Sequence, residues 1–332
     1  MHPAYYSGAA LTAIWWTWDG CRGLKFYVAI TDDDWFGYLS STAPLDEVNF
    51  WQPSGGRHFR ALQPGEPFLF KLHSPKNYIV GGGFFSYFTI LPVSFAWSAF
   101  TTKNGSRSEH EMRARIAHYR KVPPSPAEDY EIGCILLQSP FFFSEDEWIP
   151  ASDWSPNIVQ GRGYDPADQR GQSIWQEVQY RLKTVPALSA LPAEQVEEAA
   201  RFGAPQLVLP RLGQGSFRVV VTDAYKRRCA FTGSPVLHVL EAAHIKPFAE
   251  QGPNDVHNGI LLRQDVHTLF DRGYITVTPE YRVEVSRRIK EEFENGHEYY
   301  SAHGKLIALP EETTLKPGQD FLSWHNENRY LG

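Results

Sequence analysis

The feature that most constrains this chain is an ordered series of polar residues between apolar segments, running from His244 to His267. An apolar segment at residues 236–243 leads directly into His244, which predicts a strand that ends at a histidine. Asn258 opens a second apolar segment after a loop, and His267 lies among apolar residues at helical spacing. The order predicts a hairpin followed by a helix, with polar side chains brought to one place.

These side chains have the chemistry that hydrolysis of a phosphodiester requires. A general base must take a proton from water, and neutral histidine has a suitable pKa near 7. A divalent cation must neutralise the charge that develops on the phosphate and on the leaving oxygen. A histidine at the end of a strand, facing a ligand on a helix, can provide both functions within a short segment.

The string EAAHIKP…NGILL…HTLFD resembles the HNH nuclease family, whose fold is the ββα-metal fold, and in particular its restriction-endonuclease branch. The resemblance covers residues 211–285, with looser support from residues 322–325 near the C-terminus. It implies that His244 is the general base, and that Asn258 pins the loop and orients this histidine by hydrogen bonds. It also implies that His267 binds the metal ion, for which Mg²⁺ is expected and Mn²⁺ or another transition ion is the alternative.

One position departs from the family pattern. Many members carry Asp or His immediately before the first histidine as a second metal ligand, whereas this chain has Ala243. Asp271 follows His267 by four residues and would share a helix face with it, so we favour Asp271 as the second ligand. Glu241 is the other candidate. Cysteine pairs that could form a zinc knuckle are missing, and only Cys229 lies in this region, so no structural zinc is expected.

The charge of the whole chain does not indicate a nucleic-acid-binding protein, because its formal net charge is −6. Residues 211–228 differ, with five basic residues against one acidic residue. A local basic face is sufficient for phosphate contacts. Residues 217–228 have helical spacing, with Ser216 as the expected N-cap. The alternative for Arg227 and Arg228 is therefore that they form a solvated helix end without phosphate contacts. The candidates for DNA-phosphate contacts are Arg218, Lys226, Arg227, Arg228 and Lys246.

The N-terminal half has a different character. Short apolar or alternating segments at 24–30, 67–72, 78–80, 84–91 and 132–137 predict strands separated by turns. Helices are expected at 97–100 and at 108–119, where Ser108 and Glu111 have capping-box spacing. The expected fold class is α+β, with a curved, mostly antiparallel sheet or open barrel, peripheral helices, and a C-terminal ββα-metal module.

The succession of short strands, with PGEPFLFKL followed by YIVGGGFF, resembles the PUA superfamily, which includes the EVE, YTH, ASCH and SRA domains. Several of these domains flip a modified base into an aromatic cage, so the resemblance implies a reader of modified bases. Candidate pocket residues were sought where aromatic and small polar groups coincide at expected strand ends. They are Trp35, Trp51, Phe85, Tyr87, Asp33 and Asp34. The alternative for each aromatic residue is core packing, and for the aspartates an exposed turn.

The domain boundaries follow from composition. Residues 1–181 form the expected recognition domain, residues 182–214 a proline-punctuated linker with a short helix at 193–202, and residues 215–332 the nuclease domain. The alternative for 182–214 is an integral layer of either domain. No apolar run is long enough for a membrane span, and no signal peptide is visible, so a cytoplasmic protein is expected.

The resulting hypothesis is a modification-dependent restriction endonuclease that cleaves double-stranded DNA, recognises a cytosine-derived base and acts as a homodimer. One alternative is a conventional sequence-specific HNH restriction enzyme. Another is a catalytically decayed nucleic-acid-binding protein, which the missing ligand before His244 would explain. An RNA substrate is a smaller alternative, because PUA-like domains also bind RNA.

Overall fold

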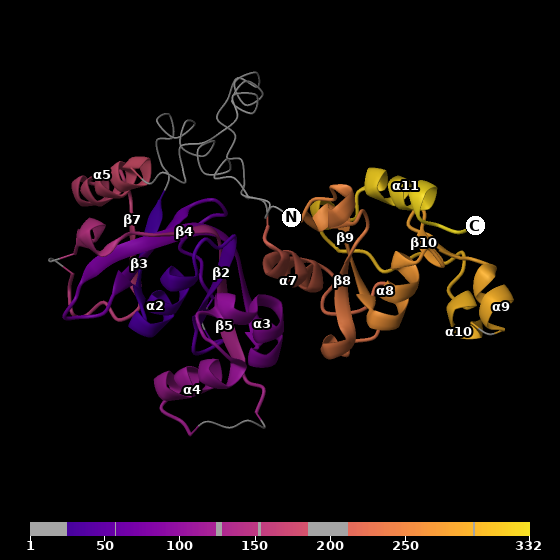
Figure 1. Ribbon diagram of the computed structural model, residues 1–332, viewed down its shortest axis with the longest axis horizontal. Helices are drawn as coiled ribbons and strands as arrows, with labels where there is room; N and C mark the ends of the chain where they lie inside the picture. Colours follow the sequence, from indigo (N-terminus) through magenta and orange to yellow (C-terminus); the bar gives the residue numbers. More distant parts are fainter. Residues whose placement is uncertain (1–24, 57, 124–127, 152–153, 185–211, 295) are drawn as a thin grey trace, which may run out of the picture. The chain divides into compact units, whose positions relative to one another are not determined.

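The computed structural model describes residues 25–56, 58–123, 128–151, 154–184, 212–294 and 296–332. The chain divides into two compact units, residues 1–210 and 211–332, which are treated separately below (Figure 1). Most of the expected linker at 182–214, including its helix at 193–202, lies outside the described residues. The predicted boundaries therefore stay a prediction.

The N-terminal unit is built on a seven-stranded sheet with the order β2-β5-β4-β3-β1-β7, and β6 pairs with β4 beside this path. Among the described strands only β1 and β3 pair in parallel, and the other pairings are antiparallel. The predicted α+β class, with a mostly antiparallel N-terminal sheet, is confirmed. The strands are β1 (Phe26–Thr31), β2 (Glu47–Gln52), β3 (Pro67–Leu72), β4 (Tyr78–Pro92), β5 (Glu131–Phe142), β6 (Ile149–Pro150) and β7 (Gly161–Tyr164).

Strand β4 joins two segments that the sequence indicated as separate strands. The three glycines at 81–83 do not interrupt it, because they pair with β3 on one side, and Gly81 and Gly82 also pair with β5. A Cβ atom at Gly82 would lie 2.7 Å from the carbonyl oxygen of Phe68 and 2.7 Å from the ring of Phe141. Because glycine has no side chain, the neighbouring strands can approach β4 closely here, and the central strand stays continuous.

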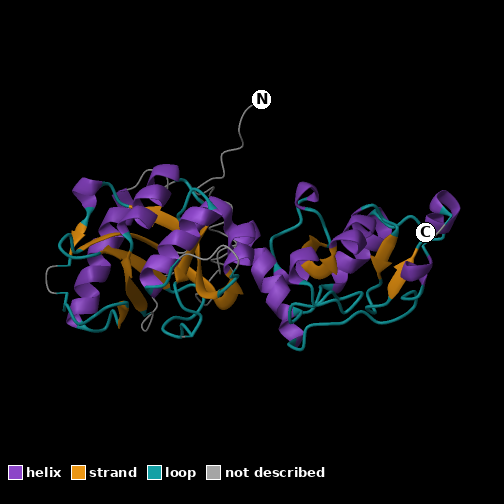
Figure 2. Ribbon diagram, turned by 90° about the horizontal axis from the view of Figure 1, so that it is seen from below, coloured by secondary structure: helices purple, strands orange, loops and turns teal. Residues whose placement is uncertain are grey.

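Helices lie around this sheet (Figure 2). Two were expected, and the structure has α3 (Val93–Phe100) and α4 (Glu109–Arg120) at these places. The Ser108 hydroxyl accepts a hydrogen bond from the Glu111 backbone N–H at 3.2 Å, which confirms the predicted N-cap. Two further helices, α2 (Asp33–Thr42) and α5 (Gln169–Thr184), were missed. Asp32 is the N-cap of α2, so the Asp32–Asp34 run begins a helix and is no simple turn.

The C-terminal unit has the expected order of strand, strand and helix. Strands β8 (Leu240–His244) and β9 (Gly259–Arg263) form an antiparallel hairpin, and α8 (Gln264–Asp271) follows directly. Helix α7 (Gln214–Ala224) precedes them, with Gly213 as its N-cap. The predicted N-cap at Ser216 is wrong, because Ser216 is a buried residue within the first turn of α7. The other elements are β10 (Ile275–Val277), β11 (Val283–Val285), α9 (Arg288–Phe293), α10 (His297–Tyr300) and α11 (Gln319–Asn328).

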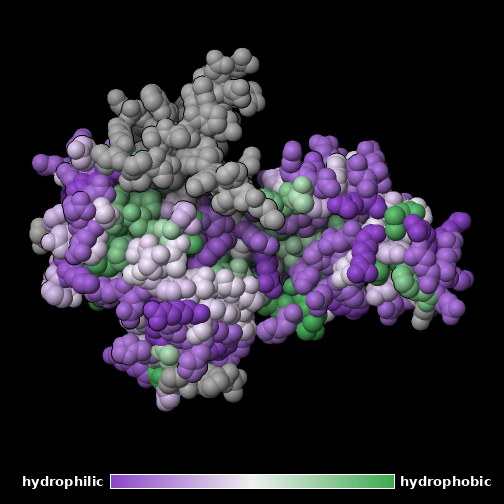
Figure 3. All heavy atoms as spheres, in the orientation of Figure 1, coloured by the Kyte–Doolittle hydropathy of each residue, from purple (hydrophilic) through white to green (hydrophobic). Residues whose placement is uncertain are grey.

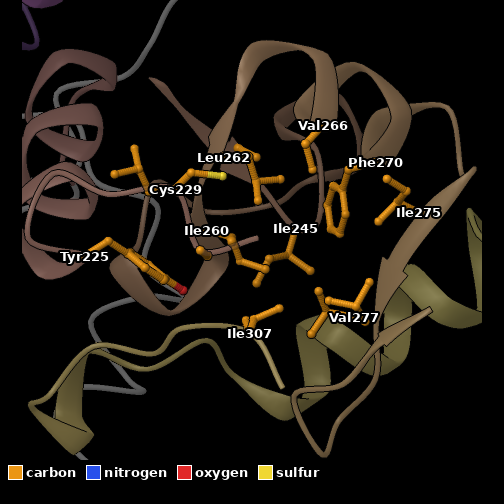
Figure 4. Packing of buried hydrophobic residues seen from close by; sticks show 14 of the residues in the cluster. Tyr225, Cys229, Ile245, Ile260, Leu262, Val266, Phe270, Ile275, Val277 and Ile307 are labelled. Atoms are coloured by element: carbon orange, nitrogen blue, oxygen red, sulfur yellow. The ribbon is translucent and has the colours of Figure 1, made fainter. Parts of the chain in front are cut away.

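One apolar core holds this unit together. Side chains from the hairpin, from α8 and from β10 meet in it, as Figure 4 shows for Ile245, Leu262, Phe270 and Val277. The core therefore fixes the relative positions of the hairpin and α8, which carry the polar residues predicted to act together.

The surface of this unit has a different character. The side seen in Figure 3 is mostly hydrophilic, with hydrophobic residues in small patches. Among the described residues, no helix is long and apolar enough to cross a membrane.

His325 of α11 packs against Phe270 of α8. Its side chain is 2% exposed, and its ring stacks on Phe270 with centroids 3.8 Å apart. Its Nε2 lies 3.1 Å from the Phe270 carbonyl oxygen, and its Nδ1 lies 2.8 Å from the Thr276 hydroxyl. A neutral imidazole can satisfy both contacts, with Nε2–H as donor and Nδ1 as acceptor. Burial lowers the pKa of His325 to about 4.

This lowered pKa predicts acid sensitivity of the C-terminal unit. The unfolded chain takes up a proton on His325 below the ordinary pKa of 6.5, while the folded chain resists protonation down to about 4. Stability therefore falls as the pH drops from 6.5 to 4, by roughly 3 kcal/mol at most from this residue. Urea unfolding at pH 7 and pH 5 measures the loss. The difference between the two pH values should shrink in His325→Gln, and an equal difference in both proteins would contradict the assignment.

Candidate active site

The β8–β9 hairpin places the first two predicted residues next to each other. His244 is the last residue of β8 and pairs with Gly259, the first residue of β9, directly after Asn258. His267 lies within α8, and both His267 and Asp271 interact electrostatically with His244. The structure thus brings His244, Asn258 and His267 together around one end of the hairpin.

The imidazole of His244 is held on two sides. Its ring stacks on Phe217 of α7, with centroids 4.0 Å apart and an interplanar angle of 14°. Its Nε2 lies 2.8 Å from the Oδ1 atom of Asn254, which is in the loop between β8 and β9. Burial lowers the pKa of His244, the hydrogen bond to Asn254 raises it, and His267 lowers it further. The net shift is downward, so His244 is neutral at pH 7, as a general base must be.

Asn258 is fully buried and holds the loop rather than the histidine ring. Its Oδ1 accepts a hydrogen bond from the Lys246 backbone N–H at 2.8 Å. Its Nδ2 donates to the carbonyl oxygens of Lys246 and Pro253, at 2.9 and 3.0 Å. These contacts support the predicted role of Asn258 in pinning the loop. The side chain that accepts a hydrogen bond from the His244 ring is that of Asn254. The sequence did not indicate Asn254, because a lone Asn in a Gly-Pro-Asn-Asp loop has only turn character.

Replacing Asn258 by alanine should destabilise the C-terminal unit. The change would leave one backbone N–H and two carbonyl groups of the loop without their side-chain partner, at a cost of about 2–5 kcal/mol. Asn258→Asp keeps the acceptor for Lys246 but loses both donors, so its effect should be intermediate. Urea unfolding of the three proteins tests this order. Equal stability of wild type and Asn258→Ala would show that the loop is held in another way.

The two ring nitrogens of His267 have different partners. Nδ1 lies 2.7 Å from Oε2 of Glu241 on β8, and Nε2 lies 3.4 Å from Oδ2 of Asp271, one helical turn further along α8. The predicted shared face of His267 and Asp271 is thus present. Histidines that bind metals commonly donate the other ring N–H to a carboxylate, which fixes the tautomer. Glu241 has this position, which leaves Nε2 and Asp271 to face an ion.

These residues fit a divalent cation that keeps most of its shell as water and phosphate oxygens. Mg²⁺ is often held by only one or two protein ligands and substrate phosphates. Within the described residues, no group of three or more His, Cys, Asp or Glu side chains is arranged to hold an ion. An ion at this place would have one imidazole nitrogen and one carboxylate as protein ligands, because Glu241 already contacts Nδ1 of His267. Cys229 is buried, and its sulfur accepts hydrogen bonds from the backbone N–H groups of Thr232 and Arg263.

The predicted DNA-phosphate residues have different surroundings. Arg218 is on α7 and half-buried, and burial lowers its pKa while the charge of Glu241 opposes the shift. The charges of Arg218 and Glu241 therefore attract each other. Lys246 follows His244 closely, and its Nζ lies 5.5 Å from the centre of the Trp324 ring.

The remaining three lie beyond the end of α7. Lys226 forms an ion pair with Glu311, and Arg227 forms one with Asp223 at 3.2 Å. Arg228 donates to the Gly233 carbonyl oxygen at 3.3 Å. Phosphate contacts by these three residues would have to compete with these partners.

The candidates for a base pocket were expected at strand ends, but most of them lie elsewhere. Trp35 is on α2, while Phe85 and Tyr87 lie inside β4. Asp33 and Asp34 are in the first turn of α2, where Asp33 pairs with Lys76 at 2.9 Å. The expectation was wrong for these residues because the acidic run begins a helix and the glycines continue a strand. Of the set, Trp51 alone lies near a strand end, that of β2.

Trp35 and Trp51 meet at one feature, the Asn104–Gly105 turn. The Trp51 Nε1–H donates to the Asn104 carbonyl oxygen at 3.0 Å. A Cβ atom at Gly105 would lie 2.1 Å from the Trp35 indole, and the φ angle of 73° also favours glycine there. Asn49 donates to Asn104 Oδ1 at 2.8 Å. Phe85 packs against Phe59, with ring centroids 5.4 Å apart.

Comparison with known proteins assigns the C-terminal site to a family. Residues 229–278 match the family model described as HNH endonuclease, and the matched segment contains His244, Asn258 and His267. That segment is an HNH endonuclease domain. Phe217 and Arg218 lie before the matched residues. The predicted resemblance of the C-terminal region is confirmed.

Two solved structures are similar to this chain. An ASCH protein from Zymomonas mobilis is 10% identical and covers 47% of this chain and 94% of its own length, with a TM-score of 0.30. A modification-dependent TagI restriction endonuclease is 12% identical and covers 87% of this chain and 77% of its own length, with a TM-score of 0.28. ASCH is one of the domain types that the N-terminal sequence resembles. A search of curated proteins finds no match.

Proposed function

We propose that this protein is a modification-dependent restriction endonuclease that hydrolyses DNA phosphodiester bonds with a divalent metal ion. The observation that carries the nuclease activity is the arrangement of a neutral, stacked His244 opposite His267 and Asp271 within an HNH endonuclease domain. His244 accepts the proton of the attacking water, and Asn258 holds the loop that follows it. His267 and Asp271 would hold the ion, and the ion would neutralise charge on the scissile phosphate.

Arg218 adds a fixed positive charge to this arrangement. Guanidinium groups bind phosphate oxygens in a bidentate manner, and partial burial strengthens such a contact. Because Arg218 interacts electrostatically with Glu241, which contacts His267, we expect it to contact the phosphate group that is cut. Lys246 would contact a neighbouring phosphate from the loop. These two contacts supply the positive charge that the chain as a whole lacks.

The proposed reader is the N-terminal unit. Two buried polar atoms near the Asn104–Gly105 turn, Trp35 Nε1 and Asn49 Oδ1, have no hydrogen-bond partner within the described part of the chain. Such groups are costly to bury without a partner. One donor and one acceptor match the edge of a cytosine-derived base, which offers an acceptor and an amino donor. Trp35 is 3% exposed and Asn49 0%, so the site has to open to admit a flipped base.

Cleavage of matched plasmids tests the proposal. Plasmid DNA with unmodified cytosine, 5-methylcytosine or 5-hydroxymethylcytosine is incubated with the protein and Mg²⁺ or Mn²⁺. We expect cleavage of one or both modified plasmids only. Equal cleavage of all three at a defined sequence would instead select a conventional restriction enzyme, and binding without cleavage would indicate a decayed nuclease. Cleavage of RNA in the same assay would redirect the substrate assignment.

A matched variant separates the reader from the nuclease. Trp35→Phe removes the indole N–H but keeps an aromatic ring in the core, so it should reduce the preference for modified DNA. His244→Ala should strongly reduce cleavage and leave that binding preference in place. Because one HNH site cuts one strand at a time, we also expect two copies of the chain on each cleaved site. Light scattering of the DNA-bound protein measures this stoichiometry.

A further inference from the structure

Asn254 makes the contact that determines which nitrogen of His244 is free. Its Oδ1 lies 2.8 Å from His244 Nε2. An amide oxygen only accepts hydrogen bonds, so Nε2 carries the hydrogen in this contact. In a neutral imidazole the other nitrogen, Nδ1, then holds the lone pair. Within the part of the chain that the structure describes, no hydrogen bond to this Nδ1 is found, which leaves its lone pair available.

The position of Asn254 is fixed by the same loop that Asn258 holds. Asn258 Nδ2 donates to the carbonyl oxygen of Pro253, the residue immediately before Asn254, at 3.0 Å. The backbone N–H of Gly252 donates to the Pro247 carbonyl oxygen at 3.0 Å. A Cβ atom at Gly252 would lie 1.8 Å from the Lys246 carbonyl oxygen, so this part of the loop packs directly against the strand end. Asn254 therefore approaches the histidine from a constrained backbone.

Phe217 and Asn254 have complementary effects on the ring. Stacking on Phe217 fixes the plane of the imidazole, because the two rings are almost parallel. Stacking does not distinguish the two ring nitrogens, since a ring turned over by 180° about its Cβ–Cγ bond would stack equally well. The hydrogen bond to Asn254 makes that distinction. Together the two contacts define both the orientation and the tautomer of His244.

We propose that Asn254 is a positioning residue, which holds His244 as the Nε2–H tautomer so that Nδ1 is the atom that accepts a proton. The inference rests on the proposed nuclease function. In the step concerned, an O–H bond of water breaks and its proton moves to Nδ1 while the water oxygen forms a bond to phosphorus. The bond from phosphorus to the leaving sugar oxygen breaks, and that oxygen takes a proton from solvent. Asn254 contacts neither water nor DNA in this step.

The test compares the tautomer of His244 by NMR in the full-length protein without added metal. ¹⁵N-labelled histidine distinguishes a protonated ring nitrogen from one with a lone pair, and the His244 signals are assigned by their loss in His244→Gln. Wild type should show protonated Nε2 and unprotonated Nδ1. Asn254→Ala should show a mixture of tautomers, and Asn254→Asp, which keeps an acceptor, should restore the wild-type pattern. Asn328→Ala removes an exposed asparagine of α11 and is the matched control.

Cleavage kinetics give the second measurement. Asn254→Ala should lower kcat by about 10- to 100-fold with little change in KM for DNA, because only the orientation of the base is affected. Asn254→Asp should recover part of this loss, and Asn328→Ala should cleave like wild type. An unchanged His244 tautomer in Asn254→Ala overturns the inference by itself, whatever the activity. Absence of cleavage by wild type overturns the proposed function, and the two failures are therefore distinguishable.

Discussion

Replacing His244 by alanine should reduce kcat for DNA cleavage by about 10²- to 10⁴-fold, the range that general bases contribute. The imidazole is neutral at pH 7 because burial lowers its pKa, and Phe217 and Asn254 hold it in one orientation. Removing it leaves no group in place of the base, while the residues facing the ion are unchanged. Single-turnover cleavage of modified plasmid at saturating Mg²⁺ measures the loss.

The control is His238→Ala, which removes an exposed histidine six residues before His244. It should cleave DNA at the wild-type rate. DNA binding by His244→Ala, measured by fluorescence anisotropy, should also remain within a few-fold of wild type, since the histidine is not a phosphate contact. Undiminished cleavage by His244→Ala would sink the assignment of the base.

His267→Ala should have the second large effect, because it removes the imidazole ligand of the proposed ion site. Only His267 and Asp271 face the ion in our assignment, so losing one of them should weaken Mn²⁺ binding by more than the 10- to 100-fold typical of changes outside the ligand shell. Cleavage should fall steeply at low metal concentration and recover in part when the concentration is raised. Calorimetric titration with Mn²⁺ measures the affinity directly.

The variant Glu241→Gln distinguishes a ligand from an orienting residue. Glutamine keeps an oxygen acceptor for the Nδ1–H of His267, which Glu241 now approaches at 2.7 Å. If Glu241 only orients His267, the loss of metal affinity should be about 10-fold and clearly smaller than in His267→Ala. A loss as large as that of His267→Ala would make Glu241 a ligand. Wild-type affinity in His267→Ala would place the ion elsewhere.

The aromatic N-terminal half was the part least accessible to sequence reasoning. Its strands follow from short apolar segments, and β3 was predicted with its observed bounds. Trp35, in contrast, was placed at a strand end, although Asp32 caps a helix that carries Trp35 into the core. An aromatic residue has similar hydrophobicity in a cage and in a core, so only the packing of α2 against the Asn104–Gly105 turn shows its surroundings.

For the C-terminal site, the sequence by itself determined the order of the hairpin and the helix, and it pointed to His244, Asn258 and His267 as the proposed site residues. The order follows from apolar periodicity and residue spacing, which are local properties of the chain, and the residues follow from the resemblance to the HNH family. The tertiary structure decided which partner each of these side chains has. Glu241 lies 26 residues from His267 and Phe217 lies 27 residues from His244, and these pairs meet only because one core packs α7, the hairpin and α8 together.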